Sequence, residues 1–235
     1  MSELPTKKIR RDPNSRKFRA TKGGAIKPEG QWHHGDLRAS LIAWGTHLLD
    51  SEGIAGMSMR AAAKLAGVSP GAPAHHFQDR NGLLAAIAAQ AFRDLVAFRR
   101  GRLEKIGLDD APARLRAVML AYVEFAQAHP ARFHLMFGPE IQNREQYPEL
   151  VEAGLASFQM LRSAIVPCLQ GANAAALREE ELAFAVWSAT HGLAVLTLDR
   201  QRVMLSATRH ATAQKLADCV VRFCLAALQG AADVR

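Results

Sequence analysis

The sequence predicts an all-α protein of about nine helices, divided into a small N-terminal three-helix unit and a larger C-terminal helical domain. Three observations support this prediction. Ala and Leu are abundant, whereas the residues that favour strands (Val, Ile, Thr and Tyr) are sparse. Apolar residues recur at spacings of three and four along most of the chain, as they do on one face of a helix. No segment alternates with the period of two that is typical of a half-buried strand.

The chain is long enough to bury one or two cores without metals or disulfides. It has 235 residues, of which 49% are hydrophobic and 22% are charged. Cys168, Cys219 and Cys224 lack the spacing of a disulfide framework or a zinc site, so we expect buried thiols in a reducing cytoplasm. We expect neither a secretory leader nor a membrane-spanning helix.

Residues 1–31 are predicted to form a flexible basic arm. They hold nine Lys or Arg and three acidic residues, so this segment carries most of the net charge of +8. Pro and Gly are frequent, and apolar periodicity is missing. Such an arm favours a polyanionic partner, either a nucleic acid or an anionic membrane surface. The alternative is a tail that only solubilises the protein, or a remnant of cloning.

Residues 32–80 are predicted to form the three-helix unit, and its first helix covers 35–52. The apolar positions of this helix fall four, three and four residues apart, which places them on one face. Gly53 follows and suits the left-handed conformation in which many helices end. The residues of this face are Leu37, Leu41, Trp44 and Leu48.

Two short helices are predicted next, joined by a tight turn at Gly67. Ser58 can cap the first of them, and Ser69 can cap the second, which ends at Phe77. Several alanines let the helices cross closely, and Val68 and Phe77 can anchor the later helix. Two helices joined in this way form a helix-turn-helix, which places its second helix in the major groove of DNA.

The exposed face of the later helix is predicted to read DNA. Small side chains permit close approach, and an alanine methyl can contact the methyl of thymine. Serine hydroxyls, helix N-terminal amides and an arginine can hold phosphates. We expect His75 to face outward and His76 to pack beneath the helix. The candidate DNA-binding residues are Ser58, Arg60, Ser69, Gly71, Ala72, Ala74, His75, His76 and Arg80.

Residues 81–235 are predicted to form the larger helical domain. Asp79 can cap a long fourth helix that runs towards Ile106 and belongs to both parts of the chain. Breaks that contain Gly or Pro separate most of the later segments. Helical patterns cover residues 111–129, 131–137, 147–170, 177–198 and 207–229.

Aromatic and methionine side chains of the larger domain are predicted either to line a small-molecule cavity or to fill the core. An apolar cavity with a few polar groups is the usual form of a ligand site. For the histidines we favour hydrogen-bonded core positions, so we expect no metal and no cofactor. The candidate pocket residues are Phe125, His129, Phe133, Met136, Phe137, Phe158, Trp187 and His191.

Several short motifs of the first part occur together at a consistent spacing. They are Ser51-Glu52-Gly53, the Ser58 start, Ala66-Gly67-Val68-Ser69, His76-Phe77 and Asp79-Arg80. On these residues, 35–84 resembles the N-terminal domain of the tetracycline-repressor-like (TetR) family of transcription regulators. The chain departs from the family at Ala74, where a Tyr that touches the DNA backbone is usual. Pro73 is predicted to kink or shorten the third helix.

The second part resembles one class of C-terminal domain in the same family. The motifs are Trp187-Ser-Ala-Thr-His191-Gly192 and the segment from Phe125 to Phe137. The resemblance implies that the apolar helices 177–198 and 207–229 pair with their copies in a dimer, and the alternative is burial within the chain. The candidate interface residues are Val186, Leu193, Leu196, Leu216, Val220 and Phe223.

Together these features predict a cytoplasmic, homodimeric transcription regulator. We expect a repressor that a small-molecule effector releases from a palindromic double-stranded operator, without a membrane partner. One alternative is a regulator that acts without a ligand, and another is a non-specific nucleic-acid or membrane-surface binder driven by the arm. An enzyme is not expected, because the sequence has no nucleophile–base motif, metal motif, phosphate-binding loop or spaced carboxylate pair.

Overall fold

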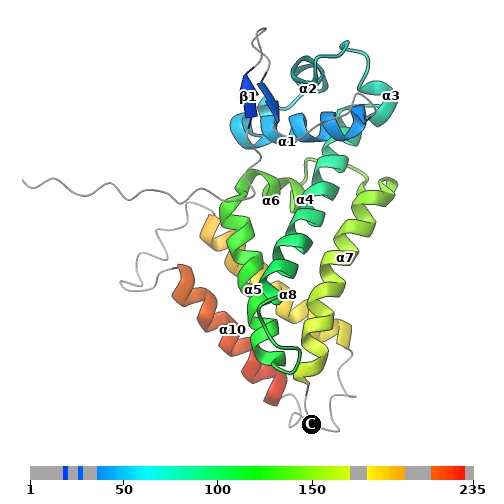
Figure 1. Ribbon diagram of the computed structural model, residues 1–235. Coiled ribbons are helices and arrows are strands. Elements are labelled where there is room, and N and C mark those ends of the chain that lie inside the picture. The colour runs from blue at the N-terminus through cyan, green and yellow to red at the C-terminus, as the bar shows by residue number, and fades with distance from the viewer. Residues whose placement is uncertain (1–17, 21–25, 29–35, 170–178, 199–212, 231–235) are drawn as a thin grey trace, which may run out of the picture.

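Nine α-helices and two short 3₁₀ helices form the helical part of the chain that the computed structural model describes (Figure 1). The described residues are 18–20, 26–28, 36–169, 179–198 and 213–230. The all-α prediction is confirmed for 36–169, 179–198 and 213–230. The helices are α1 (Leu37–Gly56), α2 (Met59–Ala66), α3 (Ala74–Phe77), α4 (Arg80–Leu103), α5 (Ala111–Ala128), α6 (Pro130–Phe137), η1 (Arg144–Gln146), α7 (Pro148–Ile165), η2 (Val166–Cys168), α8 (Glu179–Leu198) and α10 (Ala213–Gly230).

Short polar side chains begin the helices of the N-terminal unit. The Asp36 carboxylate accepts the N–H of Ala39 at 2.9 Å, and the Ser58 hydroxyl accepts the N–H of Ala61 at 3.1 Å. Gly53 has a φ of 72°, as its left-handed role requires, and helix α1 continues beyond this break to Gly56.

The turn and third helix of this unit follow the predicted order with one difference in length. Gly67 ends α2 with a φ of 71°, and its N–H and that of Val68 donate to carbonyls at the end of α2. The predicted helix over 70–77 is regular only at Ala74–Phe77, because the preceding residues form turns and Pro73 cannot donate an N–H.

Helix α4 joins the N-terminal unit to the larger domain. The Asp79 carboxylate accepts the N–H of Gly82 at 2.8 Å and so caps its first turn. Helix α4 packs against α1 and α3 as well as α5, α6 and α7, and Figure 1 shows it running from the upper unit into the lower bundle. It ends at Leu103, slightly before the predicted limit at Ile106.

A continuous apolar core follows α4 through both parts. Leu83, Leu84 and Ile87 are fully buried, and they belong to one cluster that extends from α1 and α2 to α6 and α8. A second cluster fills the bundle further along, where Leu115 and Ile165 are also fully buried. The N-terminal unit therefore shares its core with the body of the protein.

The predicted basic arm contains two short strands, which the sequence did not indicate. Strands β1 (Phe18–Ala20) and β2 (Ile26–Pro28) pair antiparallel, with Phe18 opposite Pro28. The expectation of an arm without regular structure is therefore wrong for these six residues. The other residues of 1–31 lie outside the described part of the chain.

The cysteines are free thiols, but one of them differs from the prediction. Cys168 and Cys224 are buried, whereas Cys219 is exposed on α10. The burial of Cys168 and Cys224 raises the pKa of their thiols.

Candidate DNA-reading unit and effector cavity

The segment after the Gly67 turn presents a small, exposed surface. Its exposed members come from both the turns and α3, and Ala72 is half-buried. Beneath them, Phe77 is 5% exposed and Pro73 is buried, so these two anchor the segment to the core. We call the exposed candidate residues of this segment the α3 surface, and they are Ser69, Gly71, Ala74, His75 and His76.

His76 corrects one prediction about this surface. We expected it beneath the helix, but its side chain is exposed, and only Phe77 of the His76–Phe77 motif is buried. Because α3 is a single turn, the side of the helix that faces the core is filled by Phe77 alone.

The three other candidate DNA contacts have different surroundings. Arg60 is exposed, and Ser58 uses its hydroxyl to cap α2. Arg80 donates its Nη2 to the carbonyl of Ile54 at 2.7 Å and its Nε to the carbonyl of Met57 at 3.1 Å. Arg80 therefore holds the end of α1 against α4, and its predicted phosphate contact stays a prediction.

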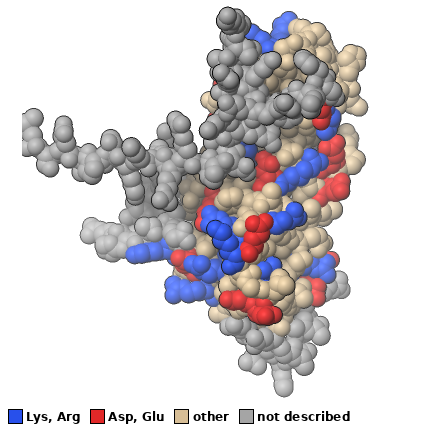
Figure 2. Space-filling view, viewed as in Figure 1, with Lys and Arg blue, Asp and Glu red and all other residues tan. Residues whose placement is uncertain are grey.

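Ion pairs connect the N-terminal unit to the body. Glu149 of α7 accepts from Arg38 of α1 at 2.7 Å and from Arg93 of α4 at 3.1 Å. Arg132 of α6 pairs with Asp50 of α1 at 2.5 Å. Figure 2 shows basic and acidic side chains interspersed over this face of the body.

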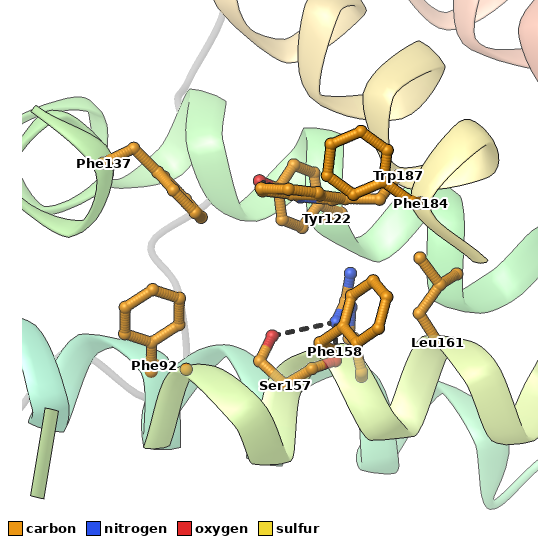
Figure 3. Close-up of a pocket in the computed structure, with 10 residues that line it drawn as sticks. Phe92, Tyr122, Phe137, Ser157, Phe158, Leu161, Phe184 and Trp187 are labelled. Atoms are coloured by element: carbon orange, nitrogen blue, oxygen red, sulfur yellow. Dashed lines mark hydrogen bonds between the residues drawn. The ribbon is translucent and has the colours of Figure 1, made fainter. Parts of the chain in front are cut away.

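The body contains an apolar cavity of about 340 Å³ between α4, α5, α6, α7 and α8. In Figure 3, aromatic side chains from α5, α6 and α8 face Phe92 of α4 and the side chains of α7 across it. Three of the predicted pocket residues, Phe137, Phe158 and Trp187, line the space. The other lining residues are Phe92, Arg99, Tyr122, Gly154, Ser157, Leu161 and Phe184.

The remaining predicted pocket residues do not line the cavity. Phe125, Phe133 and Met136 are at most 2% exposed and belong to the core. The ring of His129 lies beside that of Phe125, with centroids 4.9 Å apart and the rings tilted by 57°. Of these residues, Phe133 packs against the lining residues Tyr122 and Phe137.

His191 does not line the cavity, but its ring contacts the hydroxyl of Tyr122, which does. The imidazole Nδ1 of His191 lies 2.7 Å from the Tyr122 hydroxyl, and the Trp187 Nε1 donates to the same hydroxyl at 3.3 Å. Burial lowers the pKa of His191 and raises that of Tyr122, so both are favoured in their neutral forms. Within the described ranges, no group of three or more His, Cys, Asp or Glu residues could hold a metal ion.

Arg99 is the charged residue of the cavity lining, and it was not predicted from the sequence. Its side chain lines the cavity and is 2% exposed. It donates Nε to the Val118 carbonyl at 3.3 Å and Nη1 to the Ser157 carbonyl at 3.0 Å and hydroxyl at 3.1 Å. Burial lowers the pKa of Arg99 to about 10, which still leaves it charged at neutral pH. In the sequence it looks like part of a solvated run with Arg100 and Arg102.

The predicted interface residues divide into three groups by their exposure. Val186 and Leu193 are 4% and 8% exposed and pack inside the chain, so burial within the chain is correct for these two. Leu216 and Val220 are half-buried. By contrast, Leu196 is 47% and Phe223 is 69% exposed.

Of the described helices, α8 alone is long and apolar enough to span a membrane. In the structure, 28% of its apolar stretch is buried, and the core helices of soluble proteins can have the same length and composition.

Two family profiles match the chain, one for each part. The profile described as "Bacterial regulatory proteins, tetR family" matches residues 41–87. The profile described as "Tetracyclin repressor-like, C-terminal domain" matches residues 115–232, which is about half of the chain.

Curated relatives match over part of the chain. The HTH-type transcriptional regulator BetI of Paraburkholderia phytofirmans is 37% identical over 92 residues, which cover 38% of this chain and 46% of that regulator. BetI of Burkholderia thailandensis is 36% identical over 91 residues, with the same coverage of 38% and 46%. The match thus spans a little under half the length of these relatives.

Solved structures match over most of the chain. A protein of unknown function from Rhodococcus sp. RHA1 is 29% identical with a TM-score of 0.66, covering 85% of this chain and 99% of that one. The TetR family transcriptional regulator PfmR from Thermus thermophilus is 19% identical with a TM-score of 0.53, covering 79% and 97%. At that identity, the second likeness shows the fold alone.

Proposed function

The chain belongs to the tetracycline-repressor-like (TetR) family of bacterial regulatory proteins, and on this premise we propose that it is a cytoplasmic, ligand-responsive repressor of transcription. In this proposal, a homodimer binds a palindromic operator, and a small molecule in the body releases it. The observation that carries the proposal is the arrangement of α4, whose first turn packs against α3 and whose later residues Phe92 and Arg99 line the cavity.

The α3 surface has the chemistry of a short DNA-reading element. Ser69 and Gly71 allow close approach to the backbone, and Ala74 and His75 can meet base edges in the major groove. One turn of helix covers few base pairs, so specificity requires two copies. A twofold dimer reads half-sites about 34–36 Å apart, which is roughly one turn of DNA.

Helix α4 also gives a route from the cavity to the DNA. A ligand that shifts α4 relative to α5 and α7 would change the distance between the two α3 surfaces of a dimer. A 100-fold loss in DNA affinity requires about 2.7 kcal/mol of differential ligand binding between the two conformations. The contacts of Glu149 and Arg132 with α1 would transmit the same movement.

Footprinting of the purified protein on the DNA upstream of its own gene tests this function. We expect a symmetric protected site of about twenty base pairs. His75→Ala is expected to change the preferred sequence, whereas Arg80→Ala is expected to weaken binding to all sequences about equally. His134→Ala, which removes an exposed histidine of α6, is the matched control and should bind as the wild type does. An unprotected upstream region, or a preference changed only by Arg80→Ala, would contradict the proposal.

A further inference from the structure

In the described part of the chain, Arg99 is a buried arginine without an acidic partner, which distinguishes it from the six arginines that form ion pairs with carboxylates. Arg38, Arg93, Arg102, Arg116, Arg132 and Arg162 all pair with a carboxylate. The acceptors that the structure gives Arg99 are the Val118 and Ser157 carbonyls and the Ser157 hydroxyl. Within the described ranges, no carboxylate forms an ion pair with this guanidinium.

A buried cation without a counter-ion is costly, because burial removes its hydration. The contacts of Arg99 use its Nε and Nη1 groups, and among the described residues none accepts from its Nη2. A planar guanidinium with free N–H groups matches a carboxylate, which can accept two parallel hydrogen bonds. The Ser157 hydroxyl accepts from Arg99 and can donate its own proton to the same anion.

The rest of the cavity suits an apolar and preferably aromatic body. Its remaining side chains are mostly aromatic, and they come from several helices. Aromatic rings prefer edge-to-face or offset contacts with one another, so such a wall favours a ring over a polar group. A cavity of about 340 Å³ is near the lower end of the usual range for ligand sites, so the ligand is small. The aromatic lining consists of Phe92, Tyr122, Phe137, Phe158, Phe184 and Trp187.

We propose that the effector of this protein is a small aromatic carboxylic acid, held as its anion by Arg99 and Ser157 with its ring among the aromatic side chains of the cavity. This inference rests on the proposed function, because it identifies the chemical class of the effector. It goes further in requiring a negative charge on the ligand. A cavity that simply accepts apolar molecules would have no such requirement.

Calorimetric titration of the full-length protein with matched pairs of ligands tests the charge requirement. The probes are 2-naphthoate, 4-phenylbutyrate and decanoate, each compared with its own primary amide, which has nearly the same shape but is neutral. We expect at least one aromatic acid to bind, and to bind about tenfold or more tightly than its amide. This comparison uses only the wild-type protein, so it does not depend on the folding of any variant.

Two arginine variants locate the charge that is responsible. Arg99→Met should remove the preference for the acid over the amide, whereas Arg102→Met should keep it. Arg102 lies one turn further along α4, is 52% exposed and pairs with Glu124, so its loss changes the net charge equally without touching the cavity. Thermal unfolding of each variant without ligand checks that it is folded.

Three results would overturn the inference: amides that bind as tightly as the acids, no binding by any acid of the panel, or a preference that Arg99→Met retains. Operator binding is measured separately with and without each bound ligand. If an amide binds and releases the DNA, the proposed function stands while the carboxylate requirement fails. If the acids bind through Arg99 but leave DNA binding unchanged, the ligand class stands while the proposed release mechanism fails.

Discussion

Gly82 has no Cβ, and this allows α3 to pack against the start of α4. A Cβ added at Gly82 would lie 2.0 Å from the Phe77 carbonyl oxygen, which is a backbone atom that cannot rotate away. The same residue donates its N–H to the cap formed by Asp79. Gly82 therefore sets the distance between the proposed DNA-reading segment and the helix that carries it.

Gly82→Ala is expected to lower the free energy of unfolding by about 1–3 kcal/mol, because α3 must move to admit the methyl. Gly101→Ala is the control on the same helix, where an added Cβ meets nothing within 4 Å. Because alanine has a higher helix propensity than glycine, Gly101→Ala should leave the free energy of unfolding unchanged or raise it by up to about 1 kcal/mol. Urea unfolding followed by circular dichroism measures both, and equal effects of the two substitutions would contradict this prediction.

The half-buried imidazole of His191 gives a second prediction at this scale, about the pH dependence of stability. Burial lowers its pKa below the ordinary 6.5, so the unfolded chain takes up a proton before the folded protein does. Stability is therefore expected to fall as the pH decreases below about 6.5. His191→Asn should weaken this dependence, whereas His134→Asn at an exposed position should retain it. The measurement is the urea midpoint at about pH 7 and pH 5.5. A wild-type dependence that His191→Asn leaves unchanged would contradict the assignment.

At the scale of elements, the sequence predicted the helices well because their signals are local. Ser58 and Asp79 cap the helices expected of them, and Gly53 and Gly67 both adopt a positive φ, whereas Ser69 does not cap α3, which begins after Pro73 without a side-chain cap. The short α3 and the exposure of His76 were harder to predict, since one turn of helix has no periodicity to indicate its inward face.

The cavity could be predicted only in part, because it depends on contacts between five helices. Phe137, Phe158 and Trp187 were identified from their apolar character and line it as expected. Arg99 was missed, since a charged residue beside other arginines is typical of a solvated helix face. Its burial arises from the way α5 and α7 pack over α4, which no local pattern records.

Glu149 provides the prediction at the scale of elements, because from α7 it forms ion pairs with both α1 and α4. Burial raises the pKa of its carboxyl, but hydrogen bonds from Arg93 and Arg38 outweigh this, so the net pKa lies below 4.5. Glu149→Gln should then lower stability at neutral pH, by no more than about 1 kcal/mol because the side chain is 48% exposed. The effect should be full above pH 4.5 and fade as the pH falls through the lowered pKa.

Urea unfolding of wild type and variant at several pH values measures this effect. Glu152→Gln, an exposed position on the same helix, should differ little from wild type at any pH. A loss in Glu149→Gln that is as large in acid as at neutral pH would show that the ion pairs are not its cause.

At the scale of the whole molecule, the apolar surface of α8 and α10 supports the proposed dimer. Leu196 and Phe223 are 47% and 69% exposed, although large apolar side chains usually gain free energy from burial. A twofold interface would cover these positions in both copies at once.

Phe223→Glu is therefore expected to convert a dimer into a monomer, because it places a charge in a contact that the symmetry repeats. Light scattering coupled to size-exclusion chromatography gives the mass directly. Leu155→Glu introduces the same charge at an apolar residue of α7 that is 58% exposed, and it should remain a dimer. A dimer that survives Phe223→Glu, or that only Leu155→Glu disrupts, would place the interface elsewhere.

The burial of Arg99 also separates the two kinds of binding that the proposed function requires. Contacts with DNA phosphates weaken steeply as ionic strength rises, because releasing the counterions of DNA into a more concentrated solution gains less entropy. An anion held by Arg99 is shielded by the aromatic wall, so mobile ions screen that attraction much less. In concentrated potassium chloride, the protein should therefore dissociate from its operator while its effector stays bound.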